Sequence, residues 1–331
     1  MDPLTHSATG LFLSRAGLNR LTPLATPILI LAANAPDIDI VTLTGGPLNY
    51  LHYHRHLTHS IIAMPVMAAL TVALVWVLAR RQIRWGGAML AALVAIGSHL
   101  LLDYTNVYGI RMLLPFSSAW LRLDWTPVVD PWIWSALLLG IIGPFLSRLV
   151  TSEITSNQRR PKYHGRGFAW FALIFLLAYN LGRGVLHERA AAVLDSRTYA
   201  GEPPTHVAAM PTLNPVVWRG LVETPDWYRV REVDLSRQFD PLHGPMFQKP
   251  SMDPAIAVAR QTATIQTFLL FSQFPLWRVT PAAEPPGSRN VEVFDMRFGT
   301  PLEPGFMASA LVSPQNQVLS TAFQFGAVRP R

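Results

Sequence analysis

Apolar stretches of similar length alternate with short polar segments over the first 190 residues of the chain. Four stretches of 18–20 residues are almost free of charge: Ile61–Ala79, Trp85–Leu102, Pro131–Leu149 and Gly167–Leu186. At about 1.5 Å per helical residue, each can cross a hydrocarbon core of about 30 Å. This pattern predicts four transmembrane helices.

Two shorter apolar segments precede these helices. Ala8–Leu18 and Leu21–Ala35 are too short to span a bilayer alone, and Pro23 and Pro27 interrupt the second of them. We expect a helical hairpin that enters the bilayer only partly or packs against the other helices.

After residue 190 the pattern changes to that of a soluble domain. Val216–Glu223 and Tyr228–Leu235 flank Pro225-Asp226, which predicts a β-hairpin. Pro254–Phe271 has the length and periodicity of one amphipathic helix. Further strands are expected over Trp277–Thr280, Asn290–Phe298, Met307–Val312 and Gln317–Phe325.

These elements predict two domains. Residues 1–190 are expected to form a membrane α-helical bundle of about four transmembrane helices plus an N-terminal helical hairpin. Residues 191–331 are expected to form a soluble α+β domain with an antiparallel sheet.

Composition agrees with a membrane protein. Half of the 331 residues are hydrophobic and 14% are charged, whereas about 25% are charged in a typical soluble protein. Cysteine is absent, which excludes disulfides and thiolate metal sites. The net charge of +7 comes largely from runs in short loops, so membrane topology explains it better than nucleic-acid binding does.

The basic loops also predict orientation. Arg80, Arg81 and Arg84 mark one cytoplasmic loop. A second cytoplasmic loop carries Arg159, Arg160, Lys162 and Arg166. Residues 50–60, residues 99–130 and everything after residue 187 then fall outside a plasma (inner) membrane. The expected protein is multi-pass, with its C-terminal domain on the extracytoplasmic side.

One helical pair of polar residues interrupts the second apolar stretch. His99 and Asp103 are four residues apart, so on a helix they share a face and can converge on one metal ion. A hydrogen bond between them that closes the helix end is the simpler alternative.

A second group of metal-binding side chains precedes the first long apolar stretch. Four of the ten histidines fall within residues 51–60, namely His52, His54, His56 and His59. The first three alternate as on an extended segment, so not all of them can be ligands. A pH-sensitive or adventitious metal-binding loop is the alternative. Thr58 or Ser60 could cap the helix that begins near Ile61.

Carboxylates border the apolar segments as well. Asp37 and Asp39 follow Leu21–Ala35, and one of them could bind a metal while the other orients a histidine. A turn or helix-end role is the alternative for either. His6 becomes relevant if the hairpin returns it close to Asp37. Asp130 precedes a proline and is expected to be a helix N-cap more than a ligand.

Over roughly residues 1–190, the pattern of these motifs resembles that of the YdjM-like family of membrane-bound, metal-dependent hydrolases. The matching motifs are Thr5-His6, Pro36-Asp37-Ile38-Asp39, His54-Arg55-x-x-Thr58-His59-Ser60, Ser98-His99-x-x-x-Asp103, Tyr108-Gly109 with Pro115-Phe116, and Val129-Asp130-Pro131. A small residue is common in the family at the place of His56, so His56 is an extra.

The family is in turn similar to the zinc-dependent phospholipase C and P1 nuclease superfamily. That resemblance implies zinc, with manganese or iron as other options, and a phosphate ester substrate. His99 and Asp103 correspond best. His6, one of Asp37 and Asp39, and one of His54 and His59 correspond by order only. The chain lacks a further His-x-x-x-Glu pair after Asp103, which argues against a full three-metal site.

The resemblance implies a metal-dependent hydrolase at the outer face of the membrane, acting on a phosphate ester, with a lipid-linked ester as one option. The expected ligands are His6, Asp37, His54, His59, His99 and Asp103. The expected catalytic groups are Asp37, Asp39 and Arg55, with Arg55 and Arg111 binding substrate. Asp39, Thr58 and Asp130 are expected to support the ligands from outside.

Membrane lipid is the expected partner of this hydrolase, with no nucleic acid, while any protein partner of the C-terminal domain stays open. Two rival functions stay open too: a metal transporter or sensor, and a non-catalytic scaffold with a structural metal site.

Overall fold

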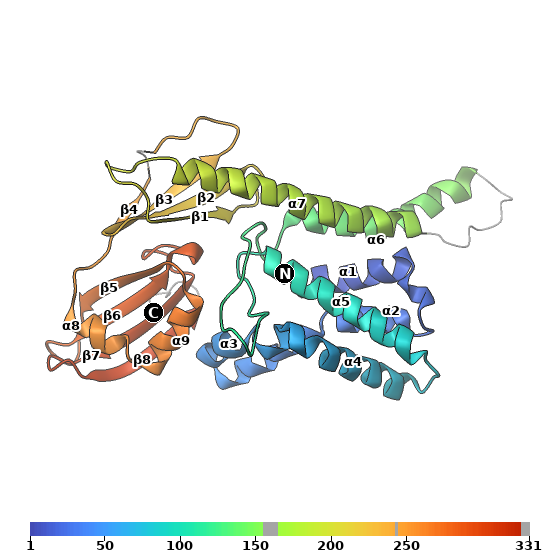
Figure 1. Ribbon diagram of the computed structural model, residues 1–331, viewed down its shortest axis with the longest axis horizontal. Helices are drawn as coiled ribbons and strands as arrows, with labels where there is room; N and C mark the ends of the chain where they lie inside the picture. The colour runs from blue at the N-terminus through green and yellow to red at the C-terminus, as the bar shows by residue number, and fades with distance from the viewer. Residues whose placement is uncertain (155–164, 242–243, 326–331) are drawn as a thin grey trace. The chain divides into compact units, whose positions relative to one another are not determined.

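The computed structural model describes residues 1–154, 165–241 and 244–325, which form two compact units (Figure 1). Unit 1 comprises Met1–Asp39, Arg55–His187 and Pro211–Pro215. Unit 2 comprises Ile40–His54, Glu188–Met210 and Val216–Arg331.

Unit 1 is helical. Its long helices are α1 (Pro3–Ala16), α2 (Ala25–Ala32), α4 (Met64–Ala79), α5 (Trp85–Thr105), α6 (Pro131–Ile154) and most of α7 (Arg166–Asp195). Short 3₁₀ segments cover Leu18–Arg20, Ala35–Gly45 (η2, which runs into unit 2), Leu57–His59 (η3) and Ile61–Ala63. Two helices begin at the same signal, because Asp2 caps α1 and Asp130 caps α6, each just before a proline.

The described residues contain three helices that are long and apolar enough to cross a membrane: Ile61–Ala79, Trp85–Thr105 and Arg166–Asp195. Three of the four expected stretches therefore form such helices. The fourth forms α6, but its apolar part, Pro131–Ser147, is shorter. The pair α2 and η2, bent by 42°, would make a fourth span if it crosses as one element.

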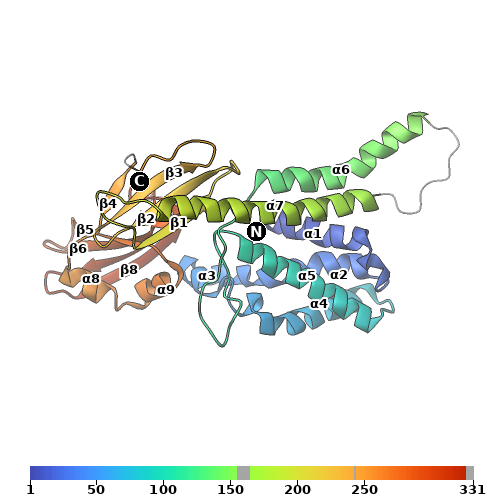
Figure 2. The same cartoon turned by 45° about the horizontal axis from the view of Figure 1, so that its top comes forward.

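Small residues let the helices of unit 1 approach closely. Helix α5 places four fully buried alanines (Ala88, Ala91, Ala92 and Ala95) in a core shared with α2 and α4. The expected hairpin is present as α1 and α2, which lie side by side (Figure 2). At Gly10 of α1, a Cβ atom would lie only 2.6 Å from the carbonyl oxygen of Leu29, so only glycine allows this contact.

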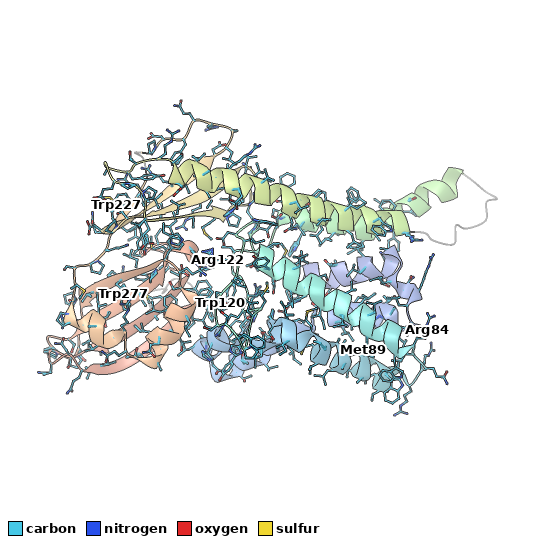
Figure 3. The ribbon with its side chains drawn as sticks, viewed as in Figure 1. Arg84, Met89, Trp120, Arg122, Trp227 and Trp277 are labelled. Atoms are coloured by element: carbon cyan, nitrogen blue, oxygen red, sulfur yellow. The ribbon has the colours of Figure 1, made fainter. Side chains whose placement is uncertain are left out.

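Helix α5 has a basic residue, Arg84, before its first turn and the buried polar pair His99 and Asp103 near its other end. Figure 3 shows Arg84 at its first end and Trp120 and Arg122 in the connection that follows its other end. His99 lies 15 residues after Arg84, which is about 22 Å along a helix axis. The residues of the second expected basic loop, Arg159, Arg160 and Lys162, lie outside the described residues.

Unit 2 contains two four-stranded antiparallel sheets, ordered β1-β2-β3-β4 and β5-β6-β7-β8. The first comprises β1 (His206–Pro211), β2 (Val217–Glu223), β3 (Trp227–Asp234) and β4 (Met246–Gln248). The second comprises β5 (Pro275–Pro281), β6 (Arg289–Asp295), β7 (Phe306–Val312) and β8 (Val318–Phe325). The expected hairpin is β2–β3, with Val217 opposite Asp234. Strands β1 and β4 have no counterpart among the strands expected from the sequence.

Two local expectations are wrong. Pro254–Phe271 is not one helix but two, α8 (Pro254–Ala259) and α9 (Ala263–Phe271), because the side chain of Thr262 caps a new helix by accepting from the Ile265 amide. The segment before His54 is not extended either. It forms helix α3 (Pro47–Tyr53), which starts with proline at its first position.

A candidate metal centre in unit 1

The candidate metal centre starts from one face of α5. His99 and Asp103 are four residues apart on this helix, and both are fully buried. The His99 Nε2 atom lies 3.3 Å from Asp103 Oδ2. Two ligand-type atoms on adjacent turns thus point to one spot, as the spacing predicts.

His59 comes to the same spot from the turn before α4. It ends the 3₁₀ segment η3 and is fully buried. Its Nε2 atom lies 3.1 Å from His99 Nε2 and 3.4 Å from Asp103 Oδ2. The ligand-type atoms of His59, His99 and Asp103 therefore form a compact triangle.

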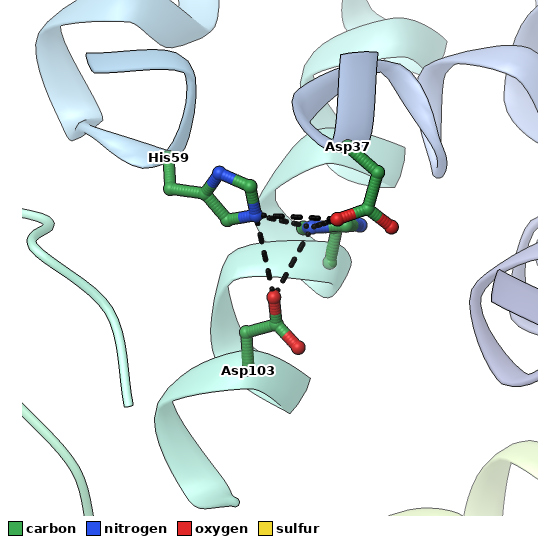
Figure 4. Close-up of side chains that lie close together, drawn as sticks. Asp37, His59 and Asp103 are labelled. Atoms are coloured by element: carbon green, nitrogen blue, oxygen red, sulfur yellow. Dashed lines mark hydrogen bonds and ion pairs between the residues drawn. The ribbon is translucent and has the colours of Figure 1, made fainter. Parts of the chain in front are cut away.

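Asp37 completes the group from the segment after α2. Its Oδ1 atom lies 3.5 Å from His59 Nε2 and 3.7 Å from His99 Nε2. Figure 4 shows these side chains directed at a common centre. The Asp37 side chain is 21% exposed, whereas those of the other three members are fully buried. Asp37 is therefore the least buried member of the cluster.

The hydrogen-bond partners of the two imidazoles fix their tautomers. His99 Nδ1 lies 2.7 Å from the carbonyl oxygen of Ala33, which only accepts, so Nδ1 carries the proton. His59 Nδ1 lies 3.2 Å from Asp39 Oδ2, and an ionised carboxylate again only accepts. His59 Nδ1 also lies 3.1 Å from the Thr58 hydroxyl, which donates its own proton to Asp39 and can therefore accept from His59. A neutral imidazole ring that is protonated on Nδ1 is unprotonated on Nε2, which then carries a lone pair.

It follows that four acceptors face one another: two imidazole lone pairs and two carboxylate oxygens. Their ligand atoms all lie within 4.8 Å of one another. Buried acceptors without a donor are costly, and a cation between them removes that cost. A buried cluster of Asp37, His59, His99 and Asp103 could therefore hold a metal ion.

The spacing fits a small divalent metal. Tetrahedral ligands at about 2.0–2.1 Å from zinc are about 3.3–3.4 Å apart. Within the cluster, the three separations among His59, His99 and Asp103 are 3.1, 3.3 and 3.4 Å. Asp37 lies slightly farther from both histidines, at 3.5 and 3.7 Å. Asp37 is therefore the most loosely placed of the four ligand-type residues.

Asp39 contacts the ring nitrogen of His59 that faces away from the cluster. Besides His59, its Oδ2 atom accepts hydrogen bonds from the Arg55 amide at 2.8 Å and from the Thr58 hydroxyl at 3.1 Å. A carboxylate on the far nitrogen of a ligating histidine is the usual outer support of a metal site. Asp37 and Asp39 thus occupy different positions, Asp37 in the cluster and Asp39 behind it.

Arg55 and Asn106 hold the other oxygen of Asp103. Asp103 Oδ1 lies 3.1 Å from Arg55 Nη2 and accepts from Asn106 Nδ2 at 3.1 Å, and the Met1 amine also contacts it. The Arg55 guanidinium further donates to the Gly109 carbonyl at 3.0 Å. Asp103 is thereby oriented with only Oδ2 facing the cluster.

Other residues named by the sequence analysis lie outside the four-donor cluster. His6 is fully buried, stacks on His99 with ring centroids 3.8 Å apart, and places Nε2 3.5 Å from Asp103 Oδ1. His54 stacks on Tyr50 at 4.4 Å. Asp130 caps α6 and accepts a hydrogen bond from the Tyr179 hydroxyl at 3.0 Å.

Arg111 is a buried cation beside the cluster-bearing segments. It is 6% exposed, and its guanidinium has no hydrogen-bond or ion-pair partner among the described residues. Its amide donates to the Arg55 carbonyl at 3.3 Å. Burial lowers the pKa of Arg111. An unpaired buried guanidinium is suited to bind an anion.

Two supporting groups escaped the sequence analysis. The Ala33 carbonyl cannot be recognised in a sequence, because every residue has one. Asn106 is three residues after Asp103 at the end of α5, so the spacing Asp-x-x-Asn was a usable signal. Helical i, i+3 neighbours can interact.

Comparison with known proteins gives a family match. A model of the family described as YdjM inner membrane protein matches residues 1–190. "Uncharacterized protein YfhP" of Bacillus subtilis (strain 168) is 28% identical over 289 residues, covering 71% of this chain and 86% of that protein. No solved structure matches the chain. The family description and the apolar helices support a location in the plasma membrane.

Proposed function

This chain belongs to the YdjM inner membrane protein family, and on that premise we propose that it is a membrane-embedded, metal-dependent hydrolase of phosphate esters. Its site would face the outside of the plasma membrane, and zinc is the metal that the donor set favours. The observation that carries the proposal is the inward-facing set of four acceptors, Asp37, His59, His99 and Asp103.

A divalent metal bound there supplies two things: an activated water at neutral pH and a positive charge for a phosphoryl oxygen. Asp37 is the member best placed to accept a proton from such a water, because it is the farthest from the histidines and the only one of the four with a partly exposed side chain. Asp39 is already engaged in orienting His59, so the role of general base goes to Asp37.

The two arginines take different roles in this proposal. Arg55 is bonded to Asp103, Asn106 and Gly109, which suits it to hold a ligand in place. Arg111 has no such partner among the described residues, which suits it to bind the phosphoryl group of a substrate. Both were candidates for substrate binding from the sequence, and Arg111 is the better one.

A structural metal site is the second candidate, because four protein ligands are typical of closed, non-catalytic zinc sites. Metal transport has less support. The polar residues of α7 are committed to local bonds: Asn180 donates to the Leu176 carbonyl at 2.8 Å, and Arg183 donates to the carbonyls of Trp125 and Pro215.

The variant Asp37→Asn separates the catalytic reading from the structural one. We expect it to retain metal through His59, His99 and Asp103 while hydrolysis of p-nitrophenyl phosphate esters falls by about 10²–10⁴-fold, as when a general base is lost. Asp226→Asn, in the β2–β3 turn, is the control. Undiminished hydrolysis by Asp37→Asn would show that Asp37 is not the general base. Stoichiometric metal without hydrolysis in the unmodified protein would favour the structural site.

A further inference from the structure

The segments that carry the metal cluster also carry large apolar side chains that are exposed. These side chains, which we call the apolar collar, are Ile38, Leu57, Ile61, Ile62, Leu113 and Phe116, and they are 42–86% exposed. Ile38 follows Asp37 directly, and Leu57 and Ile61 are two residues before and after His59. Leu113 and Phe116 belong to the turn that follows Arg111.

Backbone hydrogen bonds join two of these segments. The Ile61 amide donates to the Met112 carbonyl at 3.0 Å, and the Arg111 amide donates to the Arg55 carbonyl at 3.3 Å. The backbone of Arg111 and Met112 is thus hydrogen-bonded to the segment 55–61, which carries both His59 of the cluster and collar residues. A buried, unpaired cation and an exposed apolar surface occur together in the same few residues.

Contact of spanning helices with lipid does not account for the whole collar. Leu57, Leu113 and Phe116 lie outside the three candidate membrane spans and outside the bent pair of α2 and η2, which contains Ile38. In water, turns of this kind carry polar side chains. Exposed apolar residues beside the partly exposed Asp37 therefore indicate that the approach to the cluster is apolar.

We propose that the substrate is a membrane amphiphile, in which a long hydrocarbon chain is attached to an anionic phosphate ester. The collar holds the hydrocarbon chain in contact with the bilayer. Arg111 binds the phosphate, and a divalent metal held by the cluster would neutralise the remaining charge of the phosphate. This inference rests on the proposed hydrolase and names the class of its substrate.

The test uses the full-length protein, loaded with zinc, in lipid nanodiscs. A non-hydrolysable hexadecyl phosphonate with a photoreactive group on its chain reports binding, with hexadecyl phosphate and methyl phosphate as competitors. We expect labelling of peptides that contain the collar, blocked by hexadecyl phosphate and unaffected by methyl phosphate. Leu57→Ser and Phe116→Ser should each reduce labelling by about tenfold, the effect of losing one large apolar contact.

Leu78→Ser is the matched control, because Leu78 is equally apolar, 72% exposed and near the other end of α4. Hydrolysis of hexadecyl and methyl p-nitrophenyl phosphate is measured on the same samples. Equal hydrolysis of both esters without collar labelling would overturn the amphiphile and leave the hydrolase. Collar labelling without hydrolysis of either ester would overturn the hydrolase and leave the amphiphile site. Equal loss of labelling in Leu78→Ser would reduce the collar to ordinary lipid contact and overturn the proposal.

Discussion

At the scale of single residues, two hydrogen bonds outside the cluster determine what the cluster can bind. The Ala33 carbonyl holds the proton of His99 on Nδ1, and the Asp39 carboxylate does the same for His59. Both Nε2 lone pairs then face inward, 3.1 Å apart. Metal binding by the cluster would thus depend on residues outside its four members.

The variant Asp39→Asn tests this dependence. Asparagine is close in size but carries no charge, so its hold on the Nδ1 proton of His59 is weaker. We expect the affinity for zinc to fall by about 10–100-fold, the usual cost of losing such an outer partner. Titration against a competing chelator measures the change, with Asp226→Asn as the control. An unchanged affinity in Asp39→Asn would refute the role assigned to Asp39.

Some of these residues can be predicted from the sequence and others cannot. His99 and Asp103 were predicted as a pair, because helical spacing alone brings them together. The choice between His54 and His59 depended on a turn at Leu57–His59 that no periodicity predicts. The separate positions of Asp37 and Asp39 had the same difficulty, because the 3₁₀ segment that holds them has no simple sequence signature.

At the scale of elements, α5 positions the cluster and is itself positioned by close backbone contacts. Its third residue, Gly87, lies against the chain that connects α1 and α2, and a Cβ atom there would be 2.1 Å from the Leu21 carbonyl oxygen. The neighbouring Gly86 has no atom within 4 Å of the same position. These two glycines provide a matched pair.

Gly87→Ala is expected to destabilise unit 1, because overpacking against backbone costs about 1–3 kcal/mol. Gly86→Ala should be neutral or slightly stabilising, since alanine favours the helix. Thermal unfolding in detergent compares the two variants. A midpoint for Gly87→Ala that equals that of Gly86→Ala would contradict the close approach of α5 to Leu21.

A partly buried carboxylate, that of Glu223, links the strands of the first sheet in unit 2. Burial alone would raise the pKa of Glu223, but hydrogen bonds with His206, Lys249 and Tyr228 outweigh it and lower the pKa from 4.5 to about 2. A carboxyl whose pKa is lower in the folded state stabilises that state above its unfolded pKa. The stabilisation, roughly 3 kcal/mol, is lost as the pH falls from about 4.5 to about 2.

Hydrogen exchange of β2 and β3, corrected for the intrinsic effect of pH, measures this loss. We expect protection to decrease between about pH 4.5 and pH 2 in the unmodified protein. Glu223→Gln should show weaker protection at neutral pH and little further decrease on acidification. Glu284→Gln, in an exposed turn, is the control. Equal pH profiles for the unmodified protein and Glu223→Gln would refute the role of Glu223.

At the scale of the whole molecule, the apolar pattern predicted the division into a helical membrane region and a strand-rich region. The number of spans was less accessible, because α6 and the bent pair of α2 and η2 are intermediate in length and geometry. The pairing of eight strands into two sheets was not predicted either, since it depends on contacts between distant segments.

The basic loop before α5 predicts the orientation of the protein in the membrane. We expect Arg80, Arg81 and Arg84 to be cytoplasmic, so a cysteine at Gln82 should resist an impermeant thiol reagent in intact cells. Cysteines at Asn49 and Ser251 should react. The chain contains no native cysteine, so each label reports one position. Labelling at position 82 alone would reverse the orientation and place the cluster on the cytoplasmic side.

The metal content of the purified protein is the most direct test of the central claim, that four inward-facing acceptors hold a cation. We predict about one zinc-sized divalent ion per chain, retained in His206→Ala and lost in both His99→Ala and Asp103→Ala. Elemental analysis of the four proteins after identical purification gives the answer. Absence of stoichiometric metal from the unmodified protein, or equal occupancy in all four, would contradict the account.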